Sequence, residues 1–357
     1  PKDKFQKERK IVIEELKQGN DAESAPSENF FESNVMAGTK YAQPISGYES
    51  IIANIPRDAV IDYYKRFYGP NNMTALLIGD FEQAKMTKSL KNIFGQFPAV
   101  DLPKIEKETY TSLSGKKIYK TAADVKSTYI KYSIEAPHYL NDDYFSFMLL
   151  ENYLSDNENS PLIKILKHGT EPLATSVSAH LDTKKEFTRL NISIITENPE
   201  MVDPIIELTD KAIQSLSITP PSPELLSGYK ITRRCEDIYM SEKLHYYGFV
   251  KAPLMAITGW DFFHNLQSNI DSVKIDDVVN ACSNYFSTLN YIVTATYPVE
   301  SYSGKIEIPT GPSANDVKKF FAKQNYPQHD MASGEDFKLP KTKATTEMEK
   351  RYSEYHR

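Results

Sequence analysis

The stretch RDAVIDYYKRFYGPNNMTALLIGD at residues 57–80 aligns without a gap with IDDVVNACSNYFSTLNYIVTATYP at residues 275–298. Each stretch has the pattern of an amphipathic helix, a tight turn and a short apolar strand, and Asn72 in the first turn matches Asn290 in the second. Any amphipathic helix followed by a strand gives some similarity of this kind. The matched asparagines and the equal spacing favour instead a duplicated domain of about 200 residues, much longer than a solenoid repeat.

The duplication predicts how the chain is divided into domains. Residues 109–310 have the length of one complete copy, whereas residues 1–100 have room for only the C-terminal half of another copy. Residues 101–108 are expected to link the two copies, and the polar, lysine-rich residues 311–357 to form a connector or tail. The sequence therefore predicts two related domains, the first truncated at its N-terminus, with the missing part upstream of Pro1.

Helices and strands of unequal length are interleaved along the chain, which indicates an α+β fold, an α/β sandwich of mixed, mostly antiparallel sheet packed against helices. A long helix is expected to begin with Ser222 as its N-cap and Pro223 in its first turn. The other predicted helices cover residues 4–18, 27–36, 57–67 and 144–154, and the predicted strands cover residues 73–78, 128–133, 174–180 and 190–195.

Composition excludes several classes of protein. The 357 residues include 42 Lys and Arg against 48 Asp and Glu, a net charge of −6, which is unlike the basic surface of a nucleic-acid-binding protein. No uncharged apolar run approaches the roughly 18 residues of a membrane span. The 2 cysteines are too few for a disulfide-stapled scaffold.

The first predicted helix carries two acidic residues in an unusual place. On a helical wheel Glu8 and Glu15 point the same way and fall within the apolar arc that contains Ile11, whereas Glu14 points to a lysine-rich side. A carboxylate that points into a core costs several kcal/mol unless it is paired with a cation or a metal. The pattern is compatible with an ion pair to nearby Arg9, with a partly exposed helix edge, or with a metal site.

Three stretches resemble the inverted-zincin (M16, pitrilysin-type) metallopeptidase family. ERKIVIEEL at residues 8–16 is similar to that family's E-R-x-V-[IV]-x-x-E-[LM] helix. PISGYESIIANIPRDAVIDYYKRFYGPNNMTALLIGDF at residues 44–81 is similar to the family's P-x-x-G segment, its Y-x-P-x-N-M turn and its strand ending in G-D. SPLIKILKHGTEPLATSVSA at residues 160–179 is similar to part of its second, non-catalytic domain. The order and spacing of the three stretches make the signal specific.

The resemblance implies a zinc site that this chain would only partly supply. The family binds zinc through His-x-x-Glu-His on one helix, whose Glu is the general base, and through a Glu on a later helix. By position Glu15 corresponds to that later zinc ligand, and Glu8 to a supporting acidic residue that orients the ligands. None of the 7 histidines lies in a His-x-x-Glu-His motif, so residues 1–357 are expected to contain no catalytic residue and to be inactive alone.

A second departure from the family lies in its substrate-binding Arg and Tyr. The matching stretch has Leu166 and Lys167 where the family has Leu-Arg, and Thr175 in place of its Tyr, with one extra residue between them. The roles of that Arg and Tyr therefore do not transfer to this chain.

The resulting hypothesis is a fragment of a zinc metalloendopeptidase that encloses unfolded peptides between two halves. The complementary half is expected either on the same polypeptide or on a partner subunit, with the bacterial periplasm as the expected compartment and an organelle as the alternative. A non-catalytic M16-like subunit that is structural or binds substrate is the second hypothesis, and an unrelated adaptor is the third. A His-x-x-Glu-His motif upstream of Pro1 would favour the peptidase.

Overall fold

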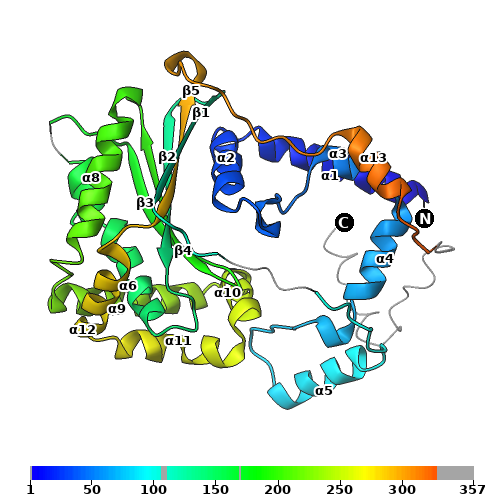
Figure 1. Cartoon of the computed structure of the whole chain (residues 1–357). Coiled ribbons are helices and arrows are strands. Elements are labelled where there is room, and N and C mark those ends of the chain that lie inside the picture. Colours follow the sequence, from blue (N-terminus) through cyan, green and yellow to red (C-terminus); the bar gives the residue numbers. More distant parts are fainter. Residues whose placement is uncertain (1, 106–110, 169, 328–357) are drawn as a thin grey trace, which may run out of the picture.

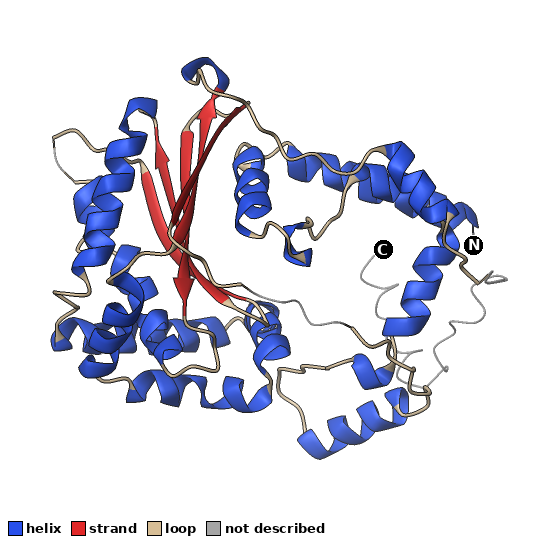
Figure 2. Ribbon diagram, in the orientation of Figure 1, coloured by secondary structure: helices blue, strands red, loops and turns tan. Residues whose placement is uncertain are grey.

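The computed structural model describes residues 2–105, 111–168 and 170–327. Residues 2–105 form helices and connecting loops without a described strand, whereas the residues after them form a mixed sheet packed against helices (Figure 1; Figure 2). The elements of the first part are α1 (Lys2–Asn20), α2 (Ala25–Val35), η1 (Lys40–Ala42), α3 (Glu49–Asn54), α4 (Arg57–Phe67), η2 (Pro70–Asn72) and α5 (Gln83–Phe94).

The second part contains a five-stranded sheet in the order β1-β5-β2-β4-β3. Only β1 and β5 are parallel, and every other neighbouring pair is antiparallel. The predicted α+β fold class with a mostly antiparallel sheet is therefore confirmed. The strands are β1 (Lys116–Ala123), β2 (Thr128–Ala136), β3 (Ser176–Thr183), β4 (Thr188–Thr196) and β5 (Tyr291–Pro298).

One face of this sheet packs against a layer of helices, and the main hydrophobic core lies between them (Figure 2). Alternate residues of the central strands point into this core, as the period of a strand requires; Tyr132 of β2, Ile192 of β4 and Val293 of β5 are all fully buried. The helices after residue 111 are α6 (Asp143–Ser155), α7 (Pro161–Leu166), α8 (Val202–Ser215), α9 (Pro223–Ser241), α10 (Leu244–Thr258), α11 (Trp260–Ser272), α12 (Ile275–Phe286) and α13 (Ala314–Ala322), with short turns η3 (Pro199–Met201) and η4 (Val299–Ser301).

The other face of the sheet is covered by α2 from the first part of the chain (Figure 1). Phe31 and Val35 of α2 form a small buried cluster with Ile292 of β5 and Phe187 of the turn between β3 and β4. Glu28 of α2 also forms an ion pair with Lys131 of β2. Contacts from α2 therefore attach the first part of the chain to the second.

The helices of the two parts repeat in the same order at the offset of 218 residues found in the sequence. At this offset α1 corresponds to α9, α2 to α10, the end of α3 to the end of α11, and α4 to α12. The correspondence thus extends the repeat about 50 residues upstream of the alignment that begins at residue 57. The predicted N-cap of α9 is confirmed, because the Ser222 hydroxyl accepts a hydrogen bond from the Leu225 N–H at 3.3 Å.

The predicted strand at residues 73–78 is wrong for the described structure. These residues are extended but pair with no described strand, and Met73 and Leu77 are exposed. The corresponding β5 is buried along its whole length, because helices cover both faces of the sheet and β1 and β2 pair with its two edges. An apolar sequence becomes a strand only where neighbouring backbone groups satisfy its N–H and C=O groups, and residues 73–78 have no described neighbour of that kind.

Both edge strands of the sheet contact other parts of the chain. Along β3 the N–H groups of Ala179 and Leu181 donate to the Ser155 hydroxyl at 2.7 Å and the Glu151 carboxylate at 3.3 Å, both on α6. Along β1 the Thr121 hydroxyl donates to the Glu307 carbonyl, and the Glu307 N–H donates back to it, each at 2.9 Å. The contacts with α6 occupy edge N–H groups of β3 that would otherwise pair with another strand, whereas the first four residues of β1 are exposed.

The segment after β5 returns to the first part of the chain (Figure 1). Within the predicted polar connector the structure has α13, which packs against α3 and buries Val317. Residues 328–357 of that connector, and residues 106–108 of the predicted linker, lie outside the described residues. In the described ranges there is no helix with the length and apolar character needed to cross a membrane.

Candidate functional site

Glu8 and Glu15 lie on one exposed face of α1, together with Ile11 and Val12. No hydrogen bond or ion pair joins either carboxylate to another described residue. Of the three interpretations that the sequence leaves open, the described structure has the exposed helix face, since the apolar arc beside Glu8 and Glu15 is itself open to solvent around Ile11. The half-buried face of α1 is a different one, formed by Phe5, Arg9, Ile13 and Leu16.

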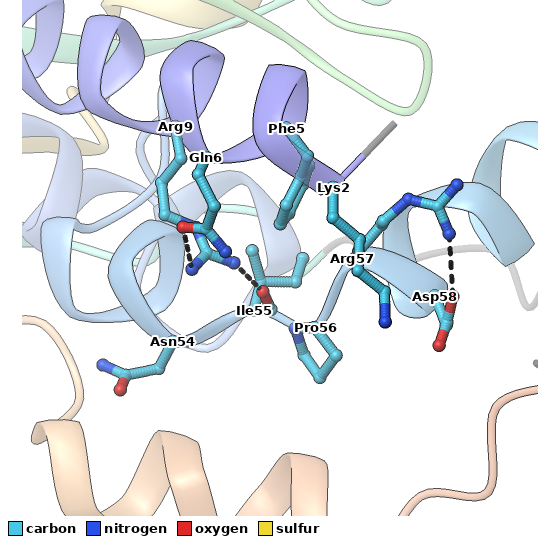
Figure 3. Close-up of a pocket in the computed structure, with 9 residues that line it drawn as sticks. All are labelled: Lys2, Phe5, Gln6, Arg9, Asn54, Ile55, Pro56, Arg57 and Asp58. Atoms are coloured by element: carbon cyan, nitrogen blue, oxygen red, sulfur yellow. Dashed lines mark hydrogen bonds and ion pairs between the residues drawn. The ribbon is translucent and has the colours of Figure 1, made fainter. Parts of the chain in front are cut away.

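Arg9 does not neutralise either carboxylate. Its guanidinium donates to the Ile55 carbonyl and to the Gln6 side chain, and lies 4.6 Å over the Phe5 ring (Figure 3). These groups belong to an open pocket of 360 Å³ between α1 and the start of α4. The pocket is lined by Lys2, Phe5, Gln6, Arg9, Asn54, Ile55, Pro56, Arg57 and Asp58. Neither Glu8 nor Glu15 is among these residues, so the pocket is separate from the carboxylate face.

The second copy indicates what the open face of α1 lacks. At the offset of 218, Glu8, Ile11 and Glu15 correspond to Leu226, Tyr229 and Arg233 of α9. Leu226 and Tyr229 are buried, and α9 packs on α6. The described residues of the first part contain no helix that covers α1 as α6 covers α9, and this explains why the same face is exposed there.

Arg233 is held by α6 through a charge-assisted contact. Its Nη2 donates to the Glu151 carboxylate at 2.5 Å and to the Met148 carbonyl at 2.7 Å. Glu151 also lies 3.0 Å from Nδ1 of His180 on β3. The two copies thus differ in the sign of the charge at this position: a carboxylate on α1 stands where α9 carries a guanidinium.

The ion-pair cluster shifts the pKa values of its members. Burial works against ionisation of Glu151, but the hydrogen bond from His180 and the charge of Arg233 outweigh it and leave the Glu151 pKa lowered. The hydrogen bond to Glu151 raises the pKa of His180, against the opposing effect of burial. Both shifts favour the ionised forms, so the folded state stabilises an imidazolium–carboxylate–guanidinium arrangement.

The cluster predicts a pH-dependent stability. The contribution of His180 is fully present below its unfolded-state pKa of 6.5 and is lost as pH rises through the raised folded-state pKa. The contribution of Glu151 is present above 4.5 and is lost as pH falls through its lowered folded-state pKa. Urea unfolding of wild type and His180→Gln should therefore differ more at about pH 6 than at about pH 8.5.

A matched control for this measurement is His245→Gln, because His245 is exposed and forms no ion pair with a described residue. The difference between wild type and His245→Gln should be the same at both pH values. A His180→Gln effect that is equally large at both pH values would contradict the assigned role of the Glu151 contact.

The described residues do not by themselves form a metal centre. In the described ranges no three His, Cys, Asp or Glu side chains lie close enough together to hold a metal ion. Zinc sites use three or four protein ligands, and α1 offers one carboxylate at the candidate ligand position with a second one two turns away. The donor set therefore fits one part of a zinc site and does not complete it.

The second predicted departure, in the substrate-binding stretch, lies near the ends of β3 and β4. Leu166 is buried at the end of α7, and the Thr175 hydroxyl donates to the Ile195 carbonyl at 3.2 Å. Thr175 also lines a second pocket of 360 Å³, formed by residues 172–175 and 196–199. Lys167 supplies a cation but not a guanidinium at the matching position of the family's Arg, and Thr175 has no phenol hydroxyl where the family has Tyr.

Comparison with known proteins identifies the family. The sequence model described as "Peptidase M16 inactive domain" matches residues 54–232, which is half of the chain. The chain belongs to the peptidase M16 family, and the matched region is of the inactive-domain type.

Individual relatives agree with this assignment. The chain is 30% identical over 90 residues to a "Zinc protease PQQL-like" protein of Arabidopsis thaliana, a match that covers 25% of this chain and 9% of that protein. In fold it is similar to a protease from Helicobacter pylori, with a TM-score of 0.72, 18% identity, and coverage of 84% of this chain and 72% of the other. It is also similar to the periplasmic protease PqqL from Escherichia coli, with a TM-score of 0.65, 13% identity, and coverage of 82% and 32%.

Sequence reasoning missed the Glu151–Arg233 pair, although a signal for it was present. Extending the repeat upstream of residue 57 at the same offset places Arg233 opposite Glu15. That alignment alone would have indicated a charged residue at the equivalent position of both helices.

Proposed function

We propose that residues 1–100 are part of the metal-bearing domain of a zinc metalloendopeptidase, in which Glu15 is one zinc ligand and Glu8 supports it. The remaining ligands and the general base belong to a His-x-x-Glu-His helix outside residues 1–357. Residues 109–310 are the related, non-catalytic domain. The chain alone is then inactive, and its substrate is an unfolded peptide enclosed with the help of a complementary half, on the same polypeptide or on a partner subunit.

The observation that carries this proposal is the pair of equivalent faces on α1 and α9. The inner charge of α9, Arg233, is neutralised by Glu151 on α6 at 2.5 Å. A helix that covered α1 in the same way would face Glu15, and a buried carboxylate requires a cation. A divalent metal meets that requirement, and the likeness to zinc proteases makes zinc the expected ion. When bound, zinc would supply Lewis-acid chemistry, and Glu15 would hold it in position.

The covered edge of β3 supports peptide binding at the first domain. Two N–H groups on that edge donate to α6, which limits the access of a substrate strand to it. A peptide that adds as a strand would use the sheet of the first domain. The periplasmic location of the E. coli protease favours a bacterial periplasm as the compartment, with an organelle as the alternative.

A non-catalytic M16-like subunit, structural or substrate-binding, is the second candidate. It is favoured by the match to the family's inactive domain and by Lys167 and Thr175, which stand where the family has an arginine and a tyrosine. If the gene encodes no His-x-x-Glu-His motif upstream of Pro1, the non-catalytic subunit is the correct candidate.

Metal removal tests the peptidase proposal. The full-length protein should hydrolyse an unfolded casein-type substrate, lose this activity on dialysis against a chelator, and regain it with Zn²⁺. Residues 1–357 alone should hydrolyse nothing and bind Zn²⁺ only weakly in a calorimetric titration, because one carboxylate supplies too few ligands. Activity that survives chelation, or tight 1:1 zinc binding by residues 1–357, would contradict the proposal.

A further inference from the structure

The guanidinium of Arg9 joins α1 to the C-terminal end of α3. Its Nη2 donates a hydrogen bond to the carbonyl of Ile55, which is the C-cap residue of α3 and directly precedes the N-cap of α4 (Figure 3). The last carbonyls of a helix have no partner within that helix, and a cation is favoured at the same end of the helix dipole. Arg9 therefore caps α3 from a neighbouring helix.

The second part of the chain contains the same connection with a different cation. Nζ of Lys230 on α9 donates to the carbonyl of Asp271 at 2.9 Å and to the carbonyl of Val273, which is the C-cap residue of α11. Val273 is the counterpart of Ile55 at the offset of 218. In both copies a cation on the first helix caps the third helix, so the contact is retained although the side chain that makes it differs.

Stability alone gives little reason to place a cation on this face of α1. Arg9 is half-buried, its Nε is buried without a partner among the described residues, and no described carboxylate forms an ion pair with it. Replacing a buried ionic group by an apolar residue of similar volume is often neutral or stabilising. A planar guanidinium holds its donors in fixed directions, so it defines where α1 lies on α3 more closely than an apolar side chain would.

Helix α3 is itself held in place by the segment that follows the second domain. Helix α13 packs on α3 and buries Val317. Gly311 lies just before α13, and a methyl group added to it would be 2.4 Å from the ring of Tyr48, the N-cap residue of α3. The contact from Arg9 therefore attaches α1 to a helix whose position is set by another part of the molecule.

We propose that Arg9 is a positioning residue for the metal site: its contact with the Ile55 carbonyl fixes the rotation and position of α1 and thereby aims Glu15. Metal ligands must be held within about 0.5 Å of their productive geometry by the groups around them. Glu15 lies on the exposed face of α1, so its position follows that of the helix. This role rests on the proposed function, in which Glu15 is a zinc ligand, and it belongs to a residue that touches neither zinc nor substrate.

Three variants of the full-length protein test this role through zinc affinity, measured by competition with a chelator. Arg9→Met removes the cation but keeps a good helix former, and it should weaken zinc binding about 10–100-fold, as the loss of a group that orients a ligand does. Arg9→Lys should recover most of this loss, because Lys230 makes the equivalent contact in the second part. Lys10→Met is the matched control, since it removes an exposed cation at the next position of α1 and should leave zinc affinity unchanged.

Hydrogen exchange of the zinc-free full-length protein, followed by mass spectrometry, tests the same role without the metal. The amides of residues 14–20 at the end of α1 should exchange about tenfold faster in Arg9→Met than in wild type or in Lys10→Met, because the helix loses an attachment and opens locally more often. The urea midpoint should be nearly the same in all three proteins, since the buried cation contributes little to global stability.

These measurements separate the positioning role from a structural one and from the proposed function. Zinc affinity of Arg9→Met equal to that of wild type, Arg9→Lys as weak as Arg9→Met, or an equal loss in Lys10→Met would each overturn the role of Arg9. A lower urea midpoint with unchanged zinc affinity would show a merely structural role and overturn it as well. Wild-type protein without zinc would contradict the proposed function alone, and the exchange rates would then decide whether Arg9 positions α1.

Discussion

Arg233→Ala should lower the free energy of unfolding of residues 1–357 by about 3 kcal/mol, the low end of what breaking a buried ion pair costs. The substitution leaves the Glu151 carboxylate mostly enclosed between α6 and β3 and removes the donor at 2.5 Å. His180 can compensate only in part, because its imidazole is charged only when protonated. Urea denaturation monitored by circular dichroism measures the effect.

The neighbouring Arg234 provides a matched control. Arg234 also forms an ion pair, with Asp271 at 2.6 Å, but its side chain is 58% exposed. Exposed pairs contribute about 0–1 kcal/mol, so Arg234→Ala should change stability little. Equal losses in the two alanine variants would show that the Glu151 contact does not hold α9 to α6.

Adding Glu151→Gln to the Arg233→Ala variant separates lost charge pairing from lost packing. The amide oxygen of Gln can still accept from the Leu181 N–H, while the uncompensated negative charge is removed. The double variant should therefore recover part of the stability lost in Arg233→Ala. Further loss of stability in the double variant would mean that the side chain of Arg233 acts mainly through packing.

The sequence predicted correctly those helices whose apolar spacing and capping residues agree with the way the helix packs in the folded chain. The helices near residues 57 and 275 and the Ser222 cap were predicted because spacing and capping chemistry act locally. Strand β1 was missed because its sequence, KKIYKTAA, lacks a regular apolar alternation and its first four residues are exposed. Two of its lysines instead pair with α8, Lys116 with Asp210 and Lys120 with Asp203.

The errors at residues 73–78 and on α1 share one physical cause. Local sequence reports which side chains are apolar, but whether a face is buried depends on a partner element elsewhere. MTALLI has the composition of a buried strand and α1 has an apolar arc, yet no described strand pairs with residues 73–78 and the Ile11 side of that arc is exposed. The second copy, where α6, β1 and β2 supply those partners, indicates what such a partner would look like.

Glu15→Gln should reduce both the zinc affinity and the peptide hydrolysis of the full-length protein by more than about 100-fold, because it removes a metal ligand. Glu8→Gln should cost about 10–100-fold, as the loss of a group that orients a ligand does. Glu14→Gln is the matched control, since Glu14 is exposed on another face of α1 and pairs with Lys17 at 3.6 Å. It should leave zinc affinity and activity near wild type.

The central claim is tested most directly by the zinc content of the purified full-length protein and of its Glu15→Gln and Glu14→Gln variants. Inductively coupled plasma mass spectrometry measures this content. The account predicts stoichiometric zinc in wild type and in Glu14→Gln, and little zinc in Glu15→Gln after dialysis. Wild-type protein without zinc, or Glu15→Gln protein that retains as much zinc as Glu14→Gln, would contradict the assignment of Glu15 as a ligand.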